Sequence, residues 1–278
     1  NGFSLNGFSL NGHSLNGLSL DGGVFSAVGK NGQLLKGLDL IGAQLKVTAL
    51  SVDQLSIKYY NLRFNNIYVD TTVPSGDVYL YDISYSQSGD KSWRSLCLDD
   101  AGNSVAAIPI RNSWNLQTGA RIDDPNAVTF ACVSGALGKC VRLGYRPWAQ
   151  ATRCSNQSKS CSTVSLADYH QACTRMIRAD YCGSGTSYTL NGTLIDVFDG
   201  LSPQIQQEAA SWPMEAQWKP TGATCLSDAR HAELVQARRP ADCARPLPSC
   251  GDSHVLSAAL LGSTFRTATS TQSSLTAR

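Results

Sequence analysis

The sequence has little charge and no long apolar run. Asp, Glu, Lys and Arg make up 16% of the 278 residues, and the formal net charge is only +2. Soluble domains usually contain about 25% charged residues. Such a balance gives no electrostatic reason to expect nucleic-acid binding. The longest apolar stretch near the end, residues 255–262, is far shorter than the ~20 residues that span a bilayer. We therefore expect no nucleic-acid partner and no membrane span.

Signatures of catalysis and metal binding are also missing from the sequence. It contains no G-x-S-x-G elbow, P-loop or dinucleotide fingerprint, and its four histidines include no H-x-x-x-H pair. The cysteines include no C-x-x-C pair, the spacing that zinc ribbons and redox motifs usually need. The sequence therefore predicts no catalytic residue, no metal and no cofactor, and it favours a protein that is not an enzyme.

The cysteines that are present favour disulfides. Their number is even, and all of them lie between residues 97 and 250. Five disulfides formed in an oxidising compartment are the favoured interpretation, with the pairing left open. The chain starts at Asn1 without a methionine, which indicates that upstream sequence, compatible with a secretion signal, has been removed. The cysteines expected to pair are Cys97, Cys132, Cys140, Cys154, Cys161, Cys173, Cys182, Cys225, Cys243 and Cys250.

The first 20 residues, NGFSLNGFSLNGHSLNGLSL, state one five-residue unit four times. The pentad phase continues to Leu55 without an insertion. Asn and Gly tolerate the positive φ that tight corners need, and the stretch resembles the pentapeptide-repeat family. That resemblance implies a short right-handed quadrilateral β-helix over residues 1–58, a β-solenoid in which each coil buries its leucines against the neighbouring coils.

The first coil of such a solenoid would have no neighbour within the chain. An unpaired strand edge is a template for assembly, so the open end predicts self-association into a homo-oligomer or filament. Truncation of a longer repeat array would explain the open end equally well. The residues expected at this end are Phe3, Leu5, Phe8, Leu10, His13, Leu15, Leu18 and Leu20.

From residue 59 the pentad period fails, and other patterns predict a disulfide-rich α+β domain over residues 59–252. Alternation predicts strands at 78–85, 104–110 and 128–133. A Ser/Thr-rich C-terminal tail is expected over residues 253–278.

Three helices are expected in this domain. Ser165 is a candidate N-cap for a helix with apolar residues at helical spacing that ends by Gly183. A second helix is expected from Ser202, and a third from Ser227 to the residue before Pro240. The overall prediction is a mixed, β-rich fold in which a short solenoid precedes an α+β domain.

The second region resembles the bacterial ADYC-domain family, named for a motif that stands here as Ala179-Asp180-Tyr181-Cys182. Neighbouring phrases resemble it too, namely FACVSGALGKCVRLGYRPW (130–148), ACTRMIRADYCGSG (172–185) and TLNGTLIDVFD (189–199). The resemblance implies a secreted or surface protein of a bacterium. It implies no reaction, because the family has no established activity to carry over.

A few polar residues are candidates for chemistry. His170 and Cys173 are three residues apart on one helix face, as a base and a thiol would be, but a disulfide is the favoured interpretation of Cys173. Asp180 follows two arginines, which favours a structural ion pair. The carboxylate candidates are Asp180, Asp196 and Asp199.

Arg142, Tyr145, Arg146 and Trp148 are candidates for a ligand surface. Guanidinium and aromatic groups can recognise a glycan or an anion, and arginine stacked on an aromatic ring inside the domain is an equally good interpretation. The favoured function is an extracellular or cell-surface structural protein, such as a matrix component or a self-assembling fibre or appendage subunit. The alternatives are a glycan-binding surface adhesin and a secreted hydrolase of unrecognised type.

Overall fold

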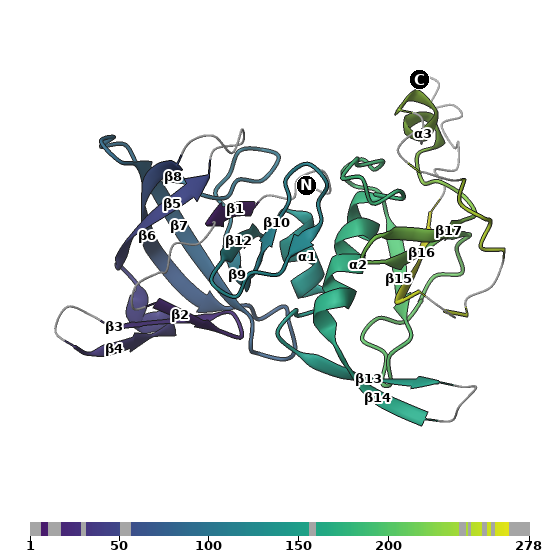
Figure 1. The fold of residues 1–278 in the computed structure, drawn as a ribbon, viewed down its shortest axis with the longest axis horizontal. Helices are drawn as coiled ribbons and strands as arrows, with labels where there is room; N and C mark the ends of the chain where they lie inside the picture. The colour runs from purple at the N-terminus through teal and green to yellow at the C-terminus, as the bar shows by residue number, and fades with distance from the viewer. Residues whose placement is uncertain are drawn as a thin grey trace, which may run out of the picture.

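The computed structural model is β-rich, with three α-helices in its described part (Figure 1). The seven-stranded sheet of the N-terminal half and the four-stranded sheet of the C-terminal half lie at opposite ends of the molecule's longest axis, with α1 and α2 between them. The structure describes residues 7–10, 18–28, 32–50, 57–155, 160–238, 243, 246–251, 255–256 and 259–266.

The N-terminal half is organised by a seven-stranded antiparallel sheet in the order β1-β12-β9-β7-β6-β5, with β8 paired to β7. We call it the curled sheet, because its end strands β1 and β5 approach within 8 Å between Cα atoms. Apolar side chains on its inner face form the first core of the protein. Its strands are β1 (Gly7–Leu10), β5 (Gln44–Leu50), β6 (Ile57–Val69), β7 (Tyr79–Gln87), β8 (Arg94–Ser95), β9 (Ala107–Arg111) and β12 (Val128–Cys132).

The prediction of a β-solenoid over residues 1–58 is wrong. The repeat region contains a three-stranded antiparallel sheet in the order β2-β3-β4 instead. The chain reverses at Gly22 and Gly23, whose φ angles of 54° and 85° suit a two-residue hairpin. A solenoid requires successive pentads to continue around one coil, and this reversal breaks that path. The elements are β2 (Leu18–Asp21), β3 (Val24–Val28), β4 (Leu34–Lys36) and the 3-10 helix η1 (Gly37–Leu40).

The residues expected at an open solenoid end pair with other strands of the chain where the structure describes them. Phe8 and Leu10 lie in β1, which pairs antiparallel with β12. Leu18 and Leu20 lie in β2, which pairs with β3, and Leu20 is buried in the core of the curled sheet. The other four lie outside the described residues: Phe3, Leu5, His13 and Leu15.

The C-terminal half packs helix α2 against a four-stranded antiparallel sheet in the order β15-β18-β16-β17. Helix α1 lies beside α2, and the hairpin of β13 and β14 projects from the body (Figure 1). The elements are β10 (Ser113–Trp114), β11 (Arg121–Ile122), α1 (Ala136–Arg142), β13 (Gln150–Ser155), β14 (Ser160–Ser165), α2 (Leu166–Arg178), β15 (Ile195–Asp199), β16 (Met214–Lys219), β17 (Gly222–Leu226), α3 (Ala232–Arg238) and β18 (Leu261–Phe265).

Several local predictions are confirmed. The three predicted strands correspond to β7, β9 and β12, and the predicted long helix is α2. The Ser165 hydroxyl accepts a hydrogen bond from the Ala167 N–H, as an N-cap does. Helix α3 begins at Ala232, later than expected. In the part of the chain that the structure describes, every helix is too short or too polar to cross a bilayer.

Two other local predictions are wrong. No helix follows Ser202, because the Asp199 carboxylate accepts the N–H groups of Leu201, Ile205 and Gln206 and holds the segment in a turn. Residues 261–265, expected within the tail, form β18 between β15 and β16, with all five residues buried. The Ser263 hydroxyl of this strand is satisfied inside the protein, where it accepts from Trp218 Nε1 and donates to Glu215.

Candidate functional site

The ADYC motif lies at the C-terminal end of α2, where the chain leaves the helix in a left-handed turn. Ala179 is the C-cap, with φ 50° and ψ 39°, and its N–H donates to the carbonyls of Arg175 and Met176. This conformation is usually taken by Gly or Asn. The turn ends the helix before Asp180 and directs the following residues into the C-terminal core.

Asp180 is completely buried and forms an ion pair with Arg175. The Arg175 Nη1 atom lies 2.5 Å from Asp180 Oδ2, and the Gly185 N–H donates to the same oxygen at 2.9 Å. Arg175 also donates to the carbonyls of Thr118 and Pro220. Burial raises the pKa of Asp180, and the neighbouring Arg175 offsets part of that rise. One guanidinium therefore connects α2 to two loops and to the family motif.

Tyr181 is part of a second buried network, centred on Glu215 of β16. The Tyr181 hydroxyl donates to Glu215 Oε1 at 2.7 Å. Burial, reinforced by the Glu215 carboxylate, raises the pKa of Tyr181 well above its ordinary value, so the phenol stays protonated and donates. The aromatic ring stacks on Tyr188 and Trp218 in the core. The motif tyrosine therefore contributes both apolar packing and a hydrogen bond.

Arg230 completes the network around Glu215. Its Nε and Nη2 atoms each lie 2.6 Å from one carboxylate oxygen, which is the bidentate geometry of a strong pair. Burial alone would lower the pKa of Arg230, but the Glu215 carboxylate raises it, so the guanidinium stays charged. The Ser263 hydroxyl donates to Glu215 Oε2 at 2.7 Å, and Trp218 Nε1 donates to Ser263 at 2.8 Å. Every oxygen of the buried carboxylate therefore has donors.

The main chain of the motif runs very close to the turn between β16 and β17. A Cβ atom added to Gly183, which has φ 68°, would lie 1.9 Å from the Thr221 carbonyl oxygen. The Ala223 N–H donates to the Tyr181 carbonyl at 2.8 Å. Only glycine fits this approach, so residue 183 is constrained both by its φ angle and by its neighbour.

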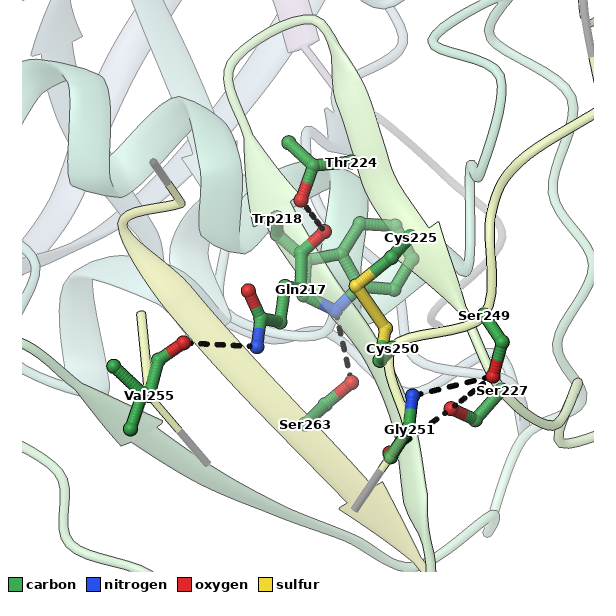
Figure 2. Close-up of a disulfide and its surroundings, with 10 residues drawn as sticks. All are labelled: Gln217, Trp218, Thr224, Cys225, Ser227, Ser249, Cys250, Gly251, Val255 and Ser263. Carbon is green, nitrogen blue, oxygen red and sulfur yellow. Dashed lines mark hydrogen bonds between the residues drawn. A yellow bond between two sulfur atoms is a disulfide. The ribbon is translucent and has the colours of Figure 1, made fainter. Parts of the chain in front are cut away.

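Two disulfides connect this region to the segment that follows α3. Cys182, the last residue of the motif, pairs with Cys243, and Cys225 of β17 pairs with Cys250. Figure 2 draws the second disulfide together with two nearby hydrogen bonds, from Trp218 Nε1 to Ser263 and from the Gly251 N–H to Ser249. The long connection between β17 and β18 is therefore held at two points.

The remaining cysteines are also paired, which confirms the disulfide-rich character of the chain. The bonds are Cys97–Cys132, Cys140–Cys173 and Cys154–Cys161. Cys173 is thus bonded across to α1 and is not a free thiol beside His170. His170 is fully buried, and its Nε2 lies 3.0 Å from the Leu137 carbonyl oxygen. Burial lowers the pKa of His170 to about 4, so its ring is neutral at pH 7.

The four residues expected to form a ligand surface each contact another part of the chain, and the Arg142 side chain remains 36% exposed. Arg142 pairs with Asp70, and Arg146 pairs with Asp77, which ties α1 and the following turn to the loop after β6. Tyr145 is buried and donates to Asp199 at 2.9 Å.

Trp148, the fourth of these residues, is half-buried against the β2–β3 turn. A Cβ atom added to Gly23 would lie 3.3 Å from its ring. The indole therefore covers a turn of the repeat region, where it helps to join that region to the ADYC motif's half of the chain.

The other carboxylate candidates also bind backbone groups. Asp199 organises the turn after β15, as described above. Asp196 Oδ2 accepts the N–H groups of Ala209 and Ala210 at 2.7 and 2.6 Å. In the part of the chain that the structure describes, no cluster of three or more His, Cys, Asp or Glu residues could hold a metal ion.

Glu215, Arg230 and Ser263, which form the network around the motif tyrosine, were not anticipated from the sequence. Glu215 interrupts the otherwise apolar or neutral segment PMEAQW, and a charge in such a segment is the signal that could have drawn attention to it. Arg230 and Ser263 lie far away in sequence and have no such signal, because only the fold brings them to Glu215.

Comparison with known protein families gives one match. The ADYC domain matches residues 37–232, which is more than half of the chain and includes the residues of both buried ion pairs. No curated protein and no solved structure matches the chain.

Proposed function

The chain belongs to the ADYC-domain family, and from the way its family motif is used we propose that it is an extracellular structural component. The observation that carries the proposal is the internal use of the motif's polar groups. Asp180 binds Arg175, Tyr181 binds Glu215, and Cys182 is in a disulfide. Each of these groups stabilises the fold through a partner within the chain.

The disulfide framework supports the extracellular part of the proposal. Five bonds use all ten cysteines, and such a number is consistent with an oxidising compartment outside the cytoplasm. Because four of the five disulfides and both buried ion pairs hold the C-terminal half of the molecule, we propose that this half is a rigid unit within a cell surface or matrix. Assembly through an open solenoid end is no longer part of the proposal.

Cell fractionation of the native source tests the location and the role. We expect the protein in the surface or matrix fraction, in assemblies that sediment faster than a monomer. In denaturant, a maleimide reagent should label no cysteine before reduction and all ten afterwards. Recovery of a strictly monomeric protein, or of a cytoplasmic protein with free thiols, would contradict the proposal.

A matched pair of aspartate variants separates this role from that of a secreted hydrolase. Asp180→Asn should lower the melting temperature, because Arg175 loses its buried anion. Asp168→Asn, in the first turn of α2 with its side chain 59% exposed, should leave the melting temperature nearly unchanged. A folded Asp180→Asn protein that had lost a hydrolytic activity of the wild type would favour an enzyme.

A further inference from the structure

A small cleft lies at the end of the curled sheet where β7 turns into β8 (near the label β8 in Figure 1). It is separate from the buried networks of the ADYC motif and uses none of the disulfides. The side chains that matter here belong to β6, β7, β8 and the connecting turn: Tyr60, Tyr85, Gln87, Asp90, Ser92 and Arg94.

Strand register places the aromatic and polar groups of the cleft on one face. Tyr60 is paired with Gln87 and Tyr85 with Arg94, and directly opposed residues point to the same side of a sheet. Both tyrosines pack against the aromatic core of the curled sheet, and their ring centroids are 6.0 Å apart with an interplanar angle of 68°. The core therefore holds two rings in fixed, roughly perpendicular orientations beside the cleft.

Asp90 is held in position by its own turn. The Ser92 N–H donates to Oδ1 at 2.8 Å, and the Ser92 hydroxyl donates to Oδ2 at 2.7 Å. Those hydrogen bonds from Ser92 lower the pKa of Asp90, so the carboxylate is ionised at neutral pH. A carboxylate offers about four lone-pair sites, which leaves capacity for a ligand hydroxyl.

Charges of both signs line the cleft. Arg94 Nη2 lies 3.7 Å from Asp90 Oδ2, with the arginine side chain 67% exposed. An isolated carboxylate beside two tyrosines would favour a cation, and an isolated guanidinium would favour an anion. Together the two charges offset each other at a distance but still provide one strong acceptor and several donors at short range. Gln87, which is exposed, adds an amide that donates and accepts.

We propose that this cleft binds a neutral saccharide unit. A pyranose ring has a face of C–H groups, which packs against the negatively polarised face of an aromatic ring, and a rim of hydroxyls that both donate and accept. Tyr60 and Tyr85 provide the aromatic surface, while Asp90, Arg94 and Gln87 reach the hydroxyls. Specific ligand sites commonly combine aromatic walls with a few fixed polar groups in this way. The inference goes beyond the proposed structural role and does not rest on it.

Saturation-transfer NMR with N-acetylglucosamine, glucose and galactose tests the proposal directly. We expect the wild-type protein to bind at least one of the three at millimolar concentration. Tyr60→Leu should weaken that binding tenfold or more, because it removes the ring, and Asp90→Asn should weaken it severalfold. Asp90 is at an exposed turn, so this second variant keeps the test valid if Tyr60→Leu does not fold.

Tyr59→Leu is the matched control. Tyr59 is adjacent to Tyr60 on β6 but is 62% exposed, and alternation along a strand directs it to the opposite face. The Tyr59→Leu variant should bind the saccharide as strongly as the wild-type protein does. Absence of binding to all three saccharides would overturn the proposal. So would unchanged binding by Asp90→Asn, or binding of tetramethylammonium in place of the sugars.

Discussion

The curled sheet and the four-stranded sheet bury different kinds of side chain. Inside the curled sheet, Phe25 lies within 5.6–6.0 Å of Phe64, Tyr81 and Phe130 between ring centroids. The core beside α2 contains apolar groups as well, but the Glu215–Arg230 and Arg175–Asp180 pairs are buried among or beside them.

Disulfides are distributed just as unevenly. One bond, Cys97–Cys132, lies in the core of the curled sheet. The other four connect α1, α2, the β13–β14 hairpin and the segments around β17. An aromatic core loses stability in proportion to the volume removed, whereas a buried ion pair fails sharply when one partner is lost. The difference predicts how each half responds to substitution.

Removal of Glu215 should have the largest effect. Glu215→Ala leaves Arg230 charged in the core and deprives Tyr181 and Ser263 of their acceptor. We expect the free energy of unfolding to fall by about 5 kcal/mol, at the upper end for broken buried pairs. Denaturant unfolding measures the change. Glu233→Ala, at an exposed carboxylate, is the control. A comparable loss of unfolding free energy in both variants would show that the buried Glu215 network contributes no more to stability than an exposed carboxylate.

Phe25→Ala should produce the next largest loss, about 4 kcal/mol, because it opens a cavity in the aromatic cluster. Phe25 precedes residue 37, where the family match begins. The experiment therefore also asks whether the repeat region shares the core of the family domain. Val28→Ala, on the same strand but 60% exposed, should change stability by less than about 0.5 kcal/mol. If both variants change the free energy of unfolding by a similar, small amount, β3 does not contribute to that core.

Replacement of Cys225 and Cys250 by alanine should cost about 3 kcal/mol, since this disulfide spans 25 residues. The same replacement at Cys154 and Cys161, which spans 7 residues within a hairpin, should cost about 2 kcal/mol by the same relation. Thermal unfolding of the two double variants compares them. If the order is reversed, loop length does not control the contribution of these disulfides.

His170 should make the C-terminal half sensitive to acid. Burial lowers the pKa of His170 to about 4, below the ordinary 6.5, so the unfolded chain binds more protons between these pH values. Stability is therefore lost as the pH falls from 6.5 toward 4, by about 2 kcal/mol between pH 7 and pH 5. His170→Gln should remove that part of the pH dependence. An unchanged pH profile in the variant would show that His170 is not the group responsible.

Local elements followed from the sequence where one strong pattern was sufficient. The apolar spacing of α2 and the Ser165 cap were both identified, because each depends on residues within a few positions. The repeat was misinterpreted because its pattern is also local, whereas its fold depends on contacts with distant strands. A five-residue period shows which residues are apolar, but it does not show what buries them. Leu20 is buried in the core of the curled sheet and not against another coil of a solenoid.

The candidate site was only partly predictable. The ion pair of Asp180 was expected because this residue follows two arginines at the end of the predicted helix, and the structure pairs it with Arg175. The surface expected around Arg142 and Trp148 could not be evaluated without the loop after β6 and the β2–β3 turn, which contact those side chains. The saccharide cleft was not anticipated, because its tyrosines read as ordinary inward-facing strand residues.

The sequence by itself determined the low charge, the even set of cysteines, the ADYC motif and the capped helix that carries it, since these are properties of composition or of neighbouring residues. The tertiary structure alone decided that the repeats join a curled sheet, which cysteines pair, and that Glu215 meets Arg230 and Ser263. Those outcomes depend on contacts between distant segments. The free energy gained by burying apolar surface depends on the packing of the whole chain, so a local sequence pattern does not specify these contacts.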